Sequence, residues 1–181
     1  MDNDSDDIVR LIAQTIAQVP CPSKTPWSSR IVLGCWAAKY IPLASKYLPG
    51  FPMTHIGFSI AYARQFLSVP NVSFNMLLPI LMAPGGKRFI AECKDTGRPV
   101  WAWTVNAEEK MLWCIRHDVD GVLTDDPKLF LDVCRRYESA EDSVKQRLSW
   151  AVWLNVYRVW IAVFIFGYLY RNRFAIRRRI R

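Results

Sequence analysis

Short apolar runs alternate with amphipathic stretches along most of this chain. Runs rich in strand-forming residues occupy four segments, at 31–36, 54–59, 99–106 and 120–127. Helical spacing or composition marks the stretches between and after them, at 40–47, 60–67, 87–96, 108–116 and 128–137. Short strands that alternate with helices of about ten residues predict repeated βα units around a parallel sheet. The near-continuous apolar character of these strands fits a sheet that is covered on both faces.

Other parts of the pattern are less decisive. Ile8, Leu11, Ile12 and Ile16 form a stripe that predicts a helix over 8–18, whereas residues 72–82 are apolar and compatible with either strand or helix. Four βα units are too few to close an eight-stranded barrel. An open doubly wound sheet is the alternative, but no glycine-rich phosphate loop accompanies it. The isolated pair Gly85-Gly86 indicates a turn.

A second apolar pattern fills residues 149–170, where only Asn155 and Arg158 interrupt it. As a helix this segment would be about 33 Å long, against roughly 30 Å of bilayer hydrocarbon. Arg158 near its middle costs about 3 kcal/mol on insertion scales. Three arrangements remain open: a helix or hairpin that spans a membrane, a helix that lies in the interface, and a helix packed on the folded domain. The first two agree on membrane contact, for which the interfacial side chains are Trp150, Trp153 and Trp160.

The net charge is +8, and residues 171–181 contain six arginines and no acid, which leaves +2 for residues 1–170. Such a local basic run indicates contact with polyanions. Aromatic and aliphatic residues lead into the run, so it favours anionic lipid headgroups over nucleic acid. We therefore expect Arg177, Arg178 and Arg179 to contact membrane phospholipids. The expected location is a membrane whose cytosolic side carries the folded part: the endoplasmic reticulum, the mitochondrial outer membrane or a lipid droplet.

Composition excludes several other classes. The five cysteines and two histidines are scattered, without a CxxC pair, which argues against a zinc site and against a disulfide framework. The acidic residues 2–7 are unlike the basic start of a signal peptide. They also lack the glycine and glutamate of a calcium-binding loop, so we expect them to precede a helix.

Two of the strand segments carry a family resemblance. Residues 100–106, VWAWTVN, resemble the WTVN strand of glycerophosphodiester phosphodiesterases, and residues 120–127, DGVLTDDP, resemble the final DGIITDDP strand of that family. Residues 27–36 and 54–66 look like strands of its lipid-acting branch, the phosphatidylglycerol phospholipase C-like proteins, which also have a hydrophobic, basic C-terminal tail. The resemblance covers residues 2–137.

The resemblance implies an α/β fold. Residues 1–137 are expected to form the C-terminal half, about strands five to eight, of a TIM-type (β/α) barrel. A polar linker at 138–148, a membrane-associated helix at 149–170 and an Arg-rich tail at 171–181 would follow. The implied function is that of a phosphoric diester hydrolase that acts on glycerophospholipids in lipid metabolism.

The same resemblance implies that the catalytic half is missing. The full-length family uses Mg²⁺ or Ca²⁺, held and assisted by His-Arg, Glu-x-Asp, His-Asp and acid–Lys motifs, and none of these occurs here. We therefore expect no catalytic residue and no bound metal in this chain, and structural roles for His55 and His117. Met1 falls just after the position expected for the catalytic lysine. The chain is thus expected to be a truncated, inactive product that could pair with a missing N-terminal half-barrel; the alternative is a non-catalytic membrane-associated protein or a gene relic.

Substrate-pocket candidates lie where the strands end. Trp103 resembles the family tryptophan that lines the glycerol pocket, with Thr104 and Asn106 beside it, and alternation places Trp101 and Trp103 on the same side. The other candidates are Trp36, Thr124 and Asp125. The adjacent Asp125 and Asp126 could act as an acid–base pair, but an aspartate before Pro127 is typical of a helix cap, which we favour.

Overall fold

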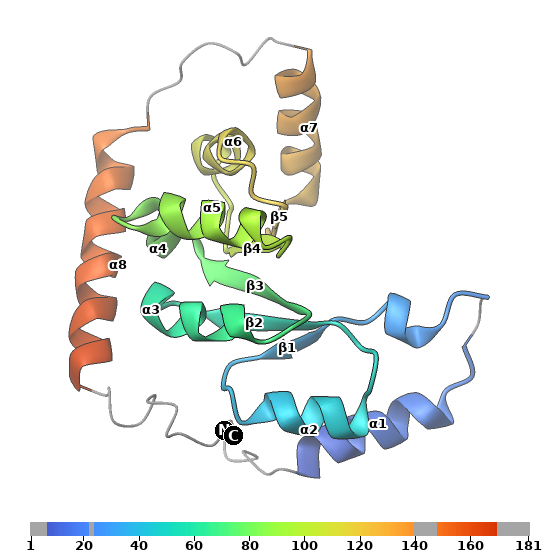
Figure 1. The fold of residues 1–181 in the computed structure, drawn as a ribbon. Coiled ribbons are helices and arrows are strands. Elements are labelled where there is room, and N and C mark those ends of the chain that lie inside the picture. Colours follow the sequence, from blue (N-terminus) through green and yellow to red (C-terminus); the bar gives the residue numbers. More distant parts are fainter. Residues whose placement is uncertain (1–6, 22–23, 140–147, 170–181) are drawn as a thin grey trace.

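Five short parallel strands form the centre of the computed structural model, which describes residues 7–21, 24–139 and 148–169 (Figure 1). They are β1 (Leu33–Cys35), β2 (Met53–Gly57), β3 (Val72–Leu77), β4 (Val100–Trp103) and β5 (Gly121–Val122). Each strand pairs with the next along the chain, so β1 and β5 are the edges of the sheet within the described residues. The predicted α/β fold with a parallel sheet is confirmed.

The helices cover the sheet as the βα pattern predicts. They are α1 (Asp7–Gln18), α2 (Tyr40–Tyr47), α3 (Ile60–Ala63), α4 (Leu78–Met82), α5 (Gly86–Asp95), α6 (Glu108–Arg116), α7 (Pro127–Glu138) and α8 (Trp150–Leu169). Two 3₁₀ segments complete the structure, η1 (Trp27–Ser29) and η2 (Arg64–Ser68). Figure 1 shows α8 as a long rod along one side of the molecule.

The structure corrects the predicted elements in three places. The apolar segment 72–82 contains both β3 and α4, so the sheet has five strands where four units were expected. The predicted helix 60–67 is α-helical only in α3 and continues as the 3₁₀ turn η2. The predicted strand 120–127 pairs regularly only at Gly121–Val122, because side-chain bonds and a helix cap take over from Thr124 onward.

The two faces of the sheet have different chemistry. On the face covered by helices, Phe74 meets Phe89 of α5 with ring centroids 5.1 Å apart, and Val100 and Ala102 are fully buried. The opposite face carries Thr54, Asn75, Trp101 and Trp103, as the strand register and alternation require. The prediction that Trp101 and Trp103 share a side is therefore confirmed, and that side is the one away from the helices.

Neither histidine lies at the carboxyl ends of the strands. His55 is in the middle of β2, on the face covered by helices, and is 1 % exposed. The predicted strand run 54–59 put His55 near the start of the strand, but β2 begins earlier, at Met53. His117 follows α6, where its ring stacks on Trp113 at 4.2 Å and its Nδ1 lies 2.8 Å from the Trp113 carbonyl oxygen. Both positions fit the structural roles expected for these residues.

The helix α8 packs along α4 by one stripe of its surface. Val152 and Val156 in this stripe are buried, and Trp153 and Trp160 are partly buried against the core. Of the described residues, only α8 is long and apolar enough to cross a bilayer, judged by length and composition alone, and 11 % of its most apolar window is buried. Most of this helix therefore presents apolar side chains outward.

Candidate functional site

The loops after parallel strands meet at the carboxyl edge of the sheet, and here that edge carries an aromatic cluster. Trp36 follows β1, Phe58 follows β2 and Trp103 ends β4. The ring centroids of Trp36 and Trp103 are 5.8 Å apart in an edge-to-face arrangement, and those of Trp36 and Phe58 are 6.3 Å apart. Trp36 is 52 % exposed. We call Trp36, Phe58 and Trp103 the aromatic wall.

A hydrogen bond to β3 holds Trp103 of the aromatic wall in place. Its indole N–H donates a hydrogen bond of 3.0 Å to the Asn75 carbonyl oxygen on β3. The peptide bond between Trp103 and Thr104 is cis, and the Thr104 side chain is exposed. The hydrogen bond fixes the orientation of the indole at the end of β4, so its half-buried ring is a preformed apolar surface.

A polar network lies beside the aromatic wall and joins the loops after β4 and β5. The Asn106 side-chain oxygen accepts hydrogen bonds from the Thr124 hydroxyl at 3.1 Å and from the Asp125 backbone N–H at 3.0 Å. The Asn106 amide donates to the Asp125 carboxylate at 2.6 Å. Three predicted pocket residues are thus brought together by contacts with one another, and the Asp125 carboxylate remains exposed.

The two adjacent aspartates have separate partners. Asp126 accepts a hydrogen bond of 3.0 Å from the Leu129 backbone N–H and caps α7, whose first residue is Pro127. Its own backbone N–H donates to the Thr124 hydroxyl oxygen at 3.1 Å. The predicted helix cap is therefore confirmed. The Asp126 carboxylate caps α7, whereas the Asp125 carboxylate accepts a hydrogen bond from the Asn106 amide. The pair does not form an acid–base dyad.

The described part of the chain does not supply a metal centre of the kind that the family uses. It contains no group of three or more His, Cys, Asp or Glu side chains that could hold a metal ion. At the site itself, the oxygen donors come from Asp125, Asn106 and Thr124, which include a single carboxylate. Mg²⁺ and Ca²⁺ need more oxygen ligands than this set offers, so the residues present do not fit the metal.

Thiol chemistry is also unsupported at this edge of the sheet. Cys35 ends β1 at this edge and is buried, and burial raises the pKa of its thiol. Cys93 of α5 and Cys114 of α6 are also buried. Burial raises the pKa of both thiols to about 12, so they remain protonated and unreactive at neutral pH.

The apolar helix reaches the aromatic wall from the side. The Phe166 ring of α8 meets Phe58 edge-on, with centroids 6.0 Å apart. Among the residues predicted to touch a membrane, Trp150 is 78 % exposed, whereas Trp153 and Trp160 pack partly against the domain. Arg177, Arg178 and Arg179 lie outside the described residues. Phe58 was not among the predicted site residues, because the predicted strand 54–59 includes it, whereas β2 ends at Gly57 and leaves Phe58 in the loop that follows.

Comparison with known proteins gives a consistent result. The Glycerophosphoryl diester phosphodiesterase family matches residues 2–129. A glycerophosphodiester phosphodiesterase from Caldanaerobacter subterraneus subsp. tengcongensis is 39 % identical over 44 residues, which are 24 % of this chain and 18 % of the relative.

Two crystal structures share the fold. A glycerophosphodiester phosphodiesterase from Parabacteroides distasonis has a TM-score of 0.57 at 16 % identity, over 75 % of this chain and 56 % of that one. A protein described as a glycerophosphoryl diester phosphodiesterase from Silicibacter pomeroyi has a TM-score of 0.53 at 18 % identity, over 61 % and 39 %. The chain thus spans 18 to 56 % of these relatives. Because the family match extends over most of its length, the chain belongs to the Glycerophosphoryl diester phosphodiesterase family.

Proposed function

We propose that this chain carries the glycerol-binding side of a phospholipase C-like phosphodiesterase that acts on glycerophospholipids at a membrane surface. The observation that carries the proposal is the contact between Phe166 of α8 and Phe58 of the aromatic wall. It places the most apolar helix of the domain beside the carboxyl edge of the sheet, where enzymes of this barrel class bind substrate.

Each part of the site has a role in this proposal. The faces of Trp36 and Trp103 cover the C–H groups of the glycerol, and the exposed Asn106–Asp125 pair hydrogen-bonds its hydroxyl groups. The outward side of α8 contacts membrane phospholipids, together with the Arg-rich tail, on the cytosolic side of the endoplasmic reticulum, the mitochondrial outer membrane or a lipid droplet.

The chain by itself is proposed to be inactive. The described residues offer one carboxylate at the site where several metal ligands are needed, so metal binding and proton transfer would have to come from another polypeptide segment. A second half-barrel would pair with the edge strands β1 and β5. Apolar side chains are exposed beside both edges: Val32 is 44 % exposed and Leu123 is 46 % exposed.

Vesicle binding and hydrolysis test the proposal together. The 181-residue chain is mixed with phosphatidylglycerol vesicles, with Mg²⁺ or Ca²⁺ added, and both cosedimentation and release of glycerol phosphate are measured. We expect cosedimentation without release. Release at a rate that exceeds a metal-free control would contradict the proposed inactivity, and a chain that stays in the supernatant would contradict the proposed membrane contact.

Replacing Trp103 with alanine is expected to weaken binding of glycerophosphoglycerol, the headgroup diester, about fivefold, because an aromatic surface of this kind contributes about 1 kcal/mol. Titration followed by the NMR signals of the indole N–H groups measures the affinity. The control is Trp101→Ala, on the same face of the sheet but away from its carboxyl edge. An unchanged affinity for Trp103→Ala would remove Trp103 from the site.

The second candidate function is that of a non-catalytic membrane-associated protein. The lack of a metal-binding group among the described residues favours it. Under this alternative the chain cosediments with vesicles but has no measurable affinity for glycerophosphoglycerol, so the titration separates the two functions.

A further inference from the structure

A groove runs between α8 and the segment around α3 and α4, next to the aromatic wall. Its volume is about 400 Å³, within the range of small-molecule sites. The walls are mostly apolar and include Phe58, Ile60, Ile80, Trp160, Val163 and Phe164. Because Phe58 belongs to both the groove and the aromatic wall, the groove is continuous with the candidate site.

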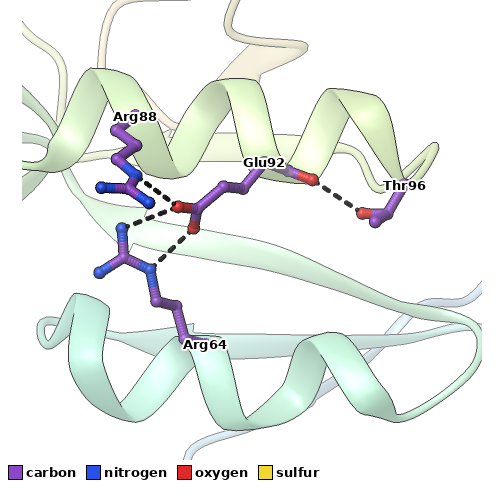
Figure 2. A network of polar contacts seen from close by, with 4 residues as sticks. All are labelled: Arg64, Arg88, Glu92 and Thr96. Atoms are coloured by element: carbon purple, nitrogen blue, oxygen red, sulfur yellow. Dashed lines mark hydrogen bonds and ion pairs between the residues drawn. The ribbon is translucent and has the colours of Figure 1, made fainter.

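Among the described residues, Arg64 is the one charged side chain that lines the groove, and its guanidinium is paired with a carboxylate. Arg64 donates to the Glu92 carboxylate at 2.7 Å and 3.2 Å, and Arg88 donates to the same carboxylate at 3.0 Å (Figure 2). Arg64, then Arg88, lowers the pKa of Glu92, so this carboxyl group stays ionised. Figure 2 shows the Arg64 side chain extending from η2 toward α5. The Arg64 guanidinium is thus held at α5, and the other described side chains that line the groove are uncharged and mostly apolar, which suits an apolar ligand.

The C-terminal half of α8 leads into this groove over an outer surface that is mostly apolar. Ile161, Ile165, Tyr168 and Leu169 are exposed by 50 to 69 %. Phe164, 67 % exposed, belongs both to this outer surface and to the groove wall. A hydrocarbon chain that leaves a bilayer in contact with α8 could thus reach the groove while remaining covered by apolar side chains.

We propose that the groove between α8 and α3–α4 binds one acyl chain of a glycerophospholipid, with its glycerol ester end toward the aromatic wall. The inference rests on the proposed function for the identity of the lipid, and on the shape and lining of the groove for the acyl chain. An acyl chain in the groove keeps its methylenes out of water, as it does in the bilayer, so the hydrophobic effect does not oppose its transfer from the bilayer to the groove.

Gly167 offers a way to fill the groove without disturbing the fold. It lines the groove, and a Cβ placed on it would have no heavy atom within 4 Å. The Gly167→Leu substitution therefore occupies ligand space, and it also favours the helix, because glycine is the poorer helix former. Ala162→Leu is the matched control: Ala162 is exposed on the same helix and does not line the groove. Ala61→Phe fills the groove from the opposite wall.

The experiment uses phosphatidylglycerol with a photoactivatable group near the end of one acyl chain, incorporated into vesicles with the full chain. Labelled peptides are identified by mass spectrometry, and the circular dichroism of each variant is compared with that of the wild type. We expect labelling to concentrate on α4 and on the groove side of α8. Gly167→Leu and Ala61→Phe should reduce it about tenfold, and Ala162→Leu should leave it unchanged.

Three outcomes would overturn the proposal or its link to phospholipid. Labelling that is spread along the outer side of α8 and is insensitive to Gly167→Leu would show that no chain enters the groove. Lipid-independent dimers linked through α8 would assign the groove to a second copy of this chain. Equal labelling by a photoactivatable fatty acid would keep the acyl groove but reject the phospholipid headgroup, and with it the proposed function.

Discussion

The Gly86→Ala variant is expected to unfold with a free energy about 3 kcal/mol lower than the wild type, the upper range for an overpacked core. Gly86 is the first residue of α5 and is buried against α4. A Cβ on Gly86 would overlap the Leu81 backbone, chiefly its carbonyl oxygen. Backbone atoms cannot rotate away as a side chain can, so α4 and α5 would have to separate. The helix α4 packs on β3 and β4, and Phe89 of α5 packs on Phe74 of β3, so displacement of the two helices would loosen the core of the sheet.

Thermal unfolding followed by circular dichroism measures this effect, and a domain of this size should lose about 6–12 °C in Tm. Two glycines serve as controls. Gly85→Ala tests backbone strain alone, because Gly85 has φ +89° but open space around it, and it should cost about 1–2 kcal/mol. Gly167→Ala, in a helix and in open space, should be neutral or stabilising. A Gly86→Ala variant as stable as the Gly167→Ala variant would contradict the close approach of α4 and α5.

Acidification is expected to destabilise the domain through His55. The ring stacks on Phe66 at 4.2 Å and meets the edge of Tyr62 at 5.4 Å, so it is enclosed by aromatic surface. Neither ring nitrogen has a hydrogen-bond partner of ordinary geometry among the described residues. Burial therefore lowers the pKa of His55 to about 4, against a weaker opposing effect of the Cys35 backbone.

The sign of the effect follows from proton uptake. In the unfolded chain His55 binds a proton near pH 6.5, whereas in the folded chain it stays neutral until about pH 4. The unfolded state thus binds more protons between these values. The free energy of unfolding is unaffected by His55 above about pH 7 and falls by about 3 kcal/mol as the pH drops from 6.5 to 4.

Urea unfolding at pH 7.5, 6 and 5 measures this dependence, and the His55→Phe variant isolates it. Phenylalanine keeps the aromatic packing but cannot bind a proton, so the variant should lose less stability on acidification than the wild type. His117→Gln is the control, because His117 is only partly buried, although burial lowers the pKa of this residue too. Parallel pH profiles for wild type and His55→Phe would show that His55 is accessible to water.

The sequence by itself determined the class of fold and the family. Strand runs and amphipathic helices alternate at spacings that only βα units satisfy, and the segments 100–106 and 120–127 carry the family pattern. Local patterns also determined that Asp126 caps a helix and that residues 150–169 form an apolar helix. Both features depend on residues only a few positions away along the chain. These features required no knowledge of long-range contacts.

The tertiary structure decided what lies next to what. The division of 72–82 into β3 and α4 depends on pairing with β2 and β4, which periodicity cannot reveal. Trp36 and Trp103 meet because parallel register brings the ends of β1 and β4 to the same edge of the sheet. Contact between Phe58 and Phe166, and the groove beside them, depends on how α8 packs on α4. Such contacts join residues that are far apart in sequence, so their geometry depends on tertiary packing and not on the local conformational preferences of the residues.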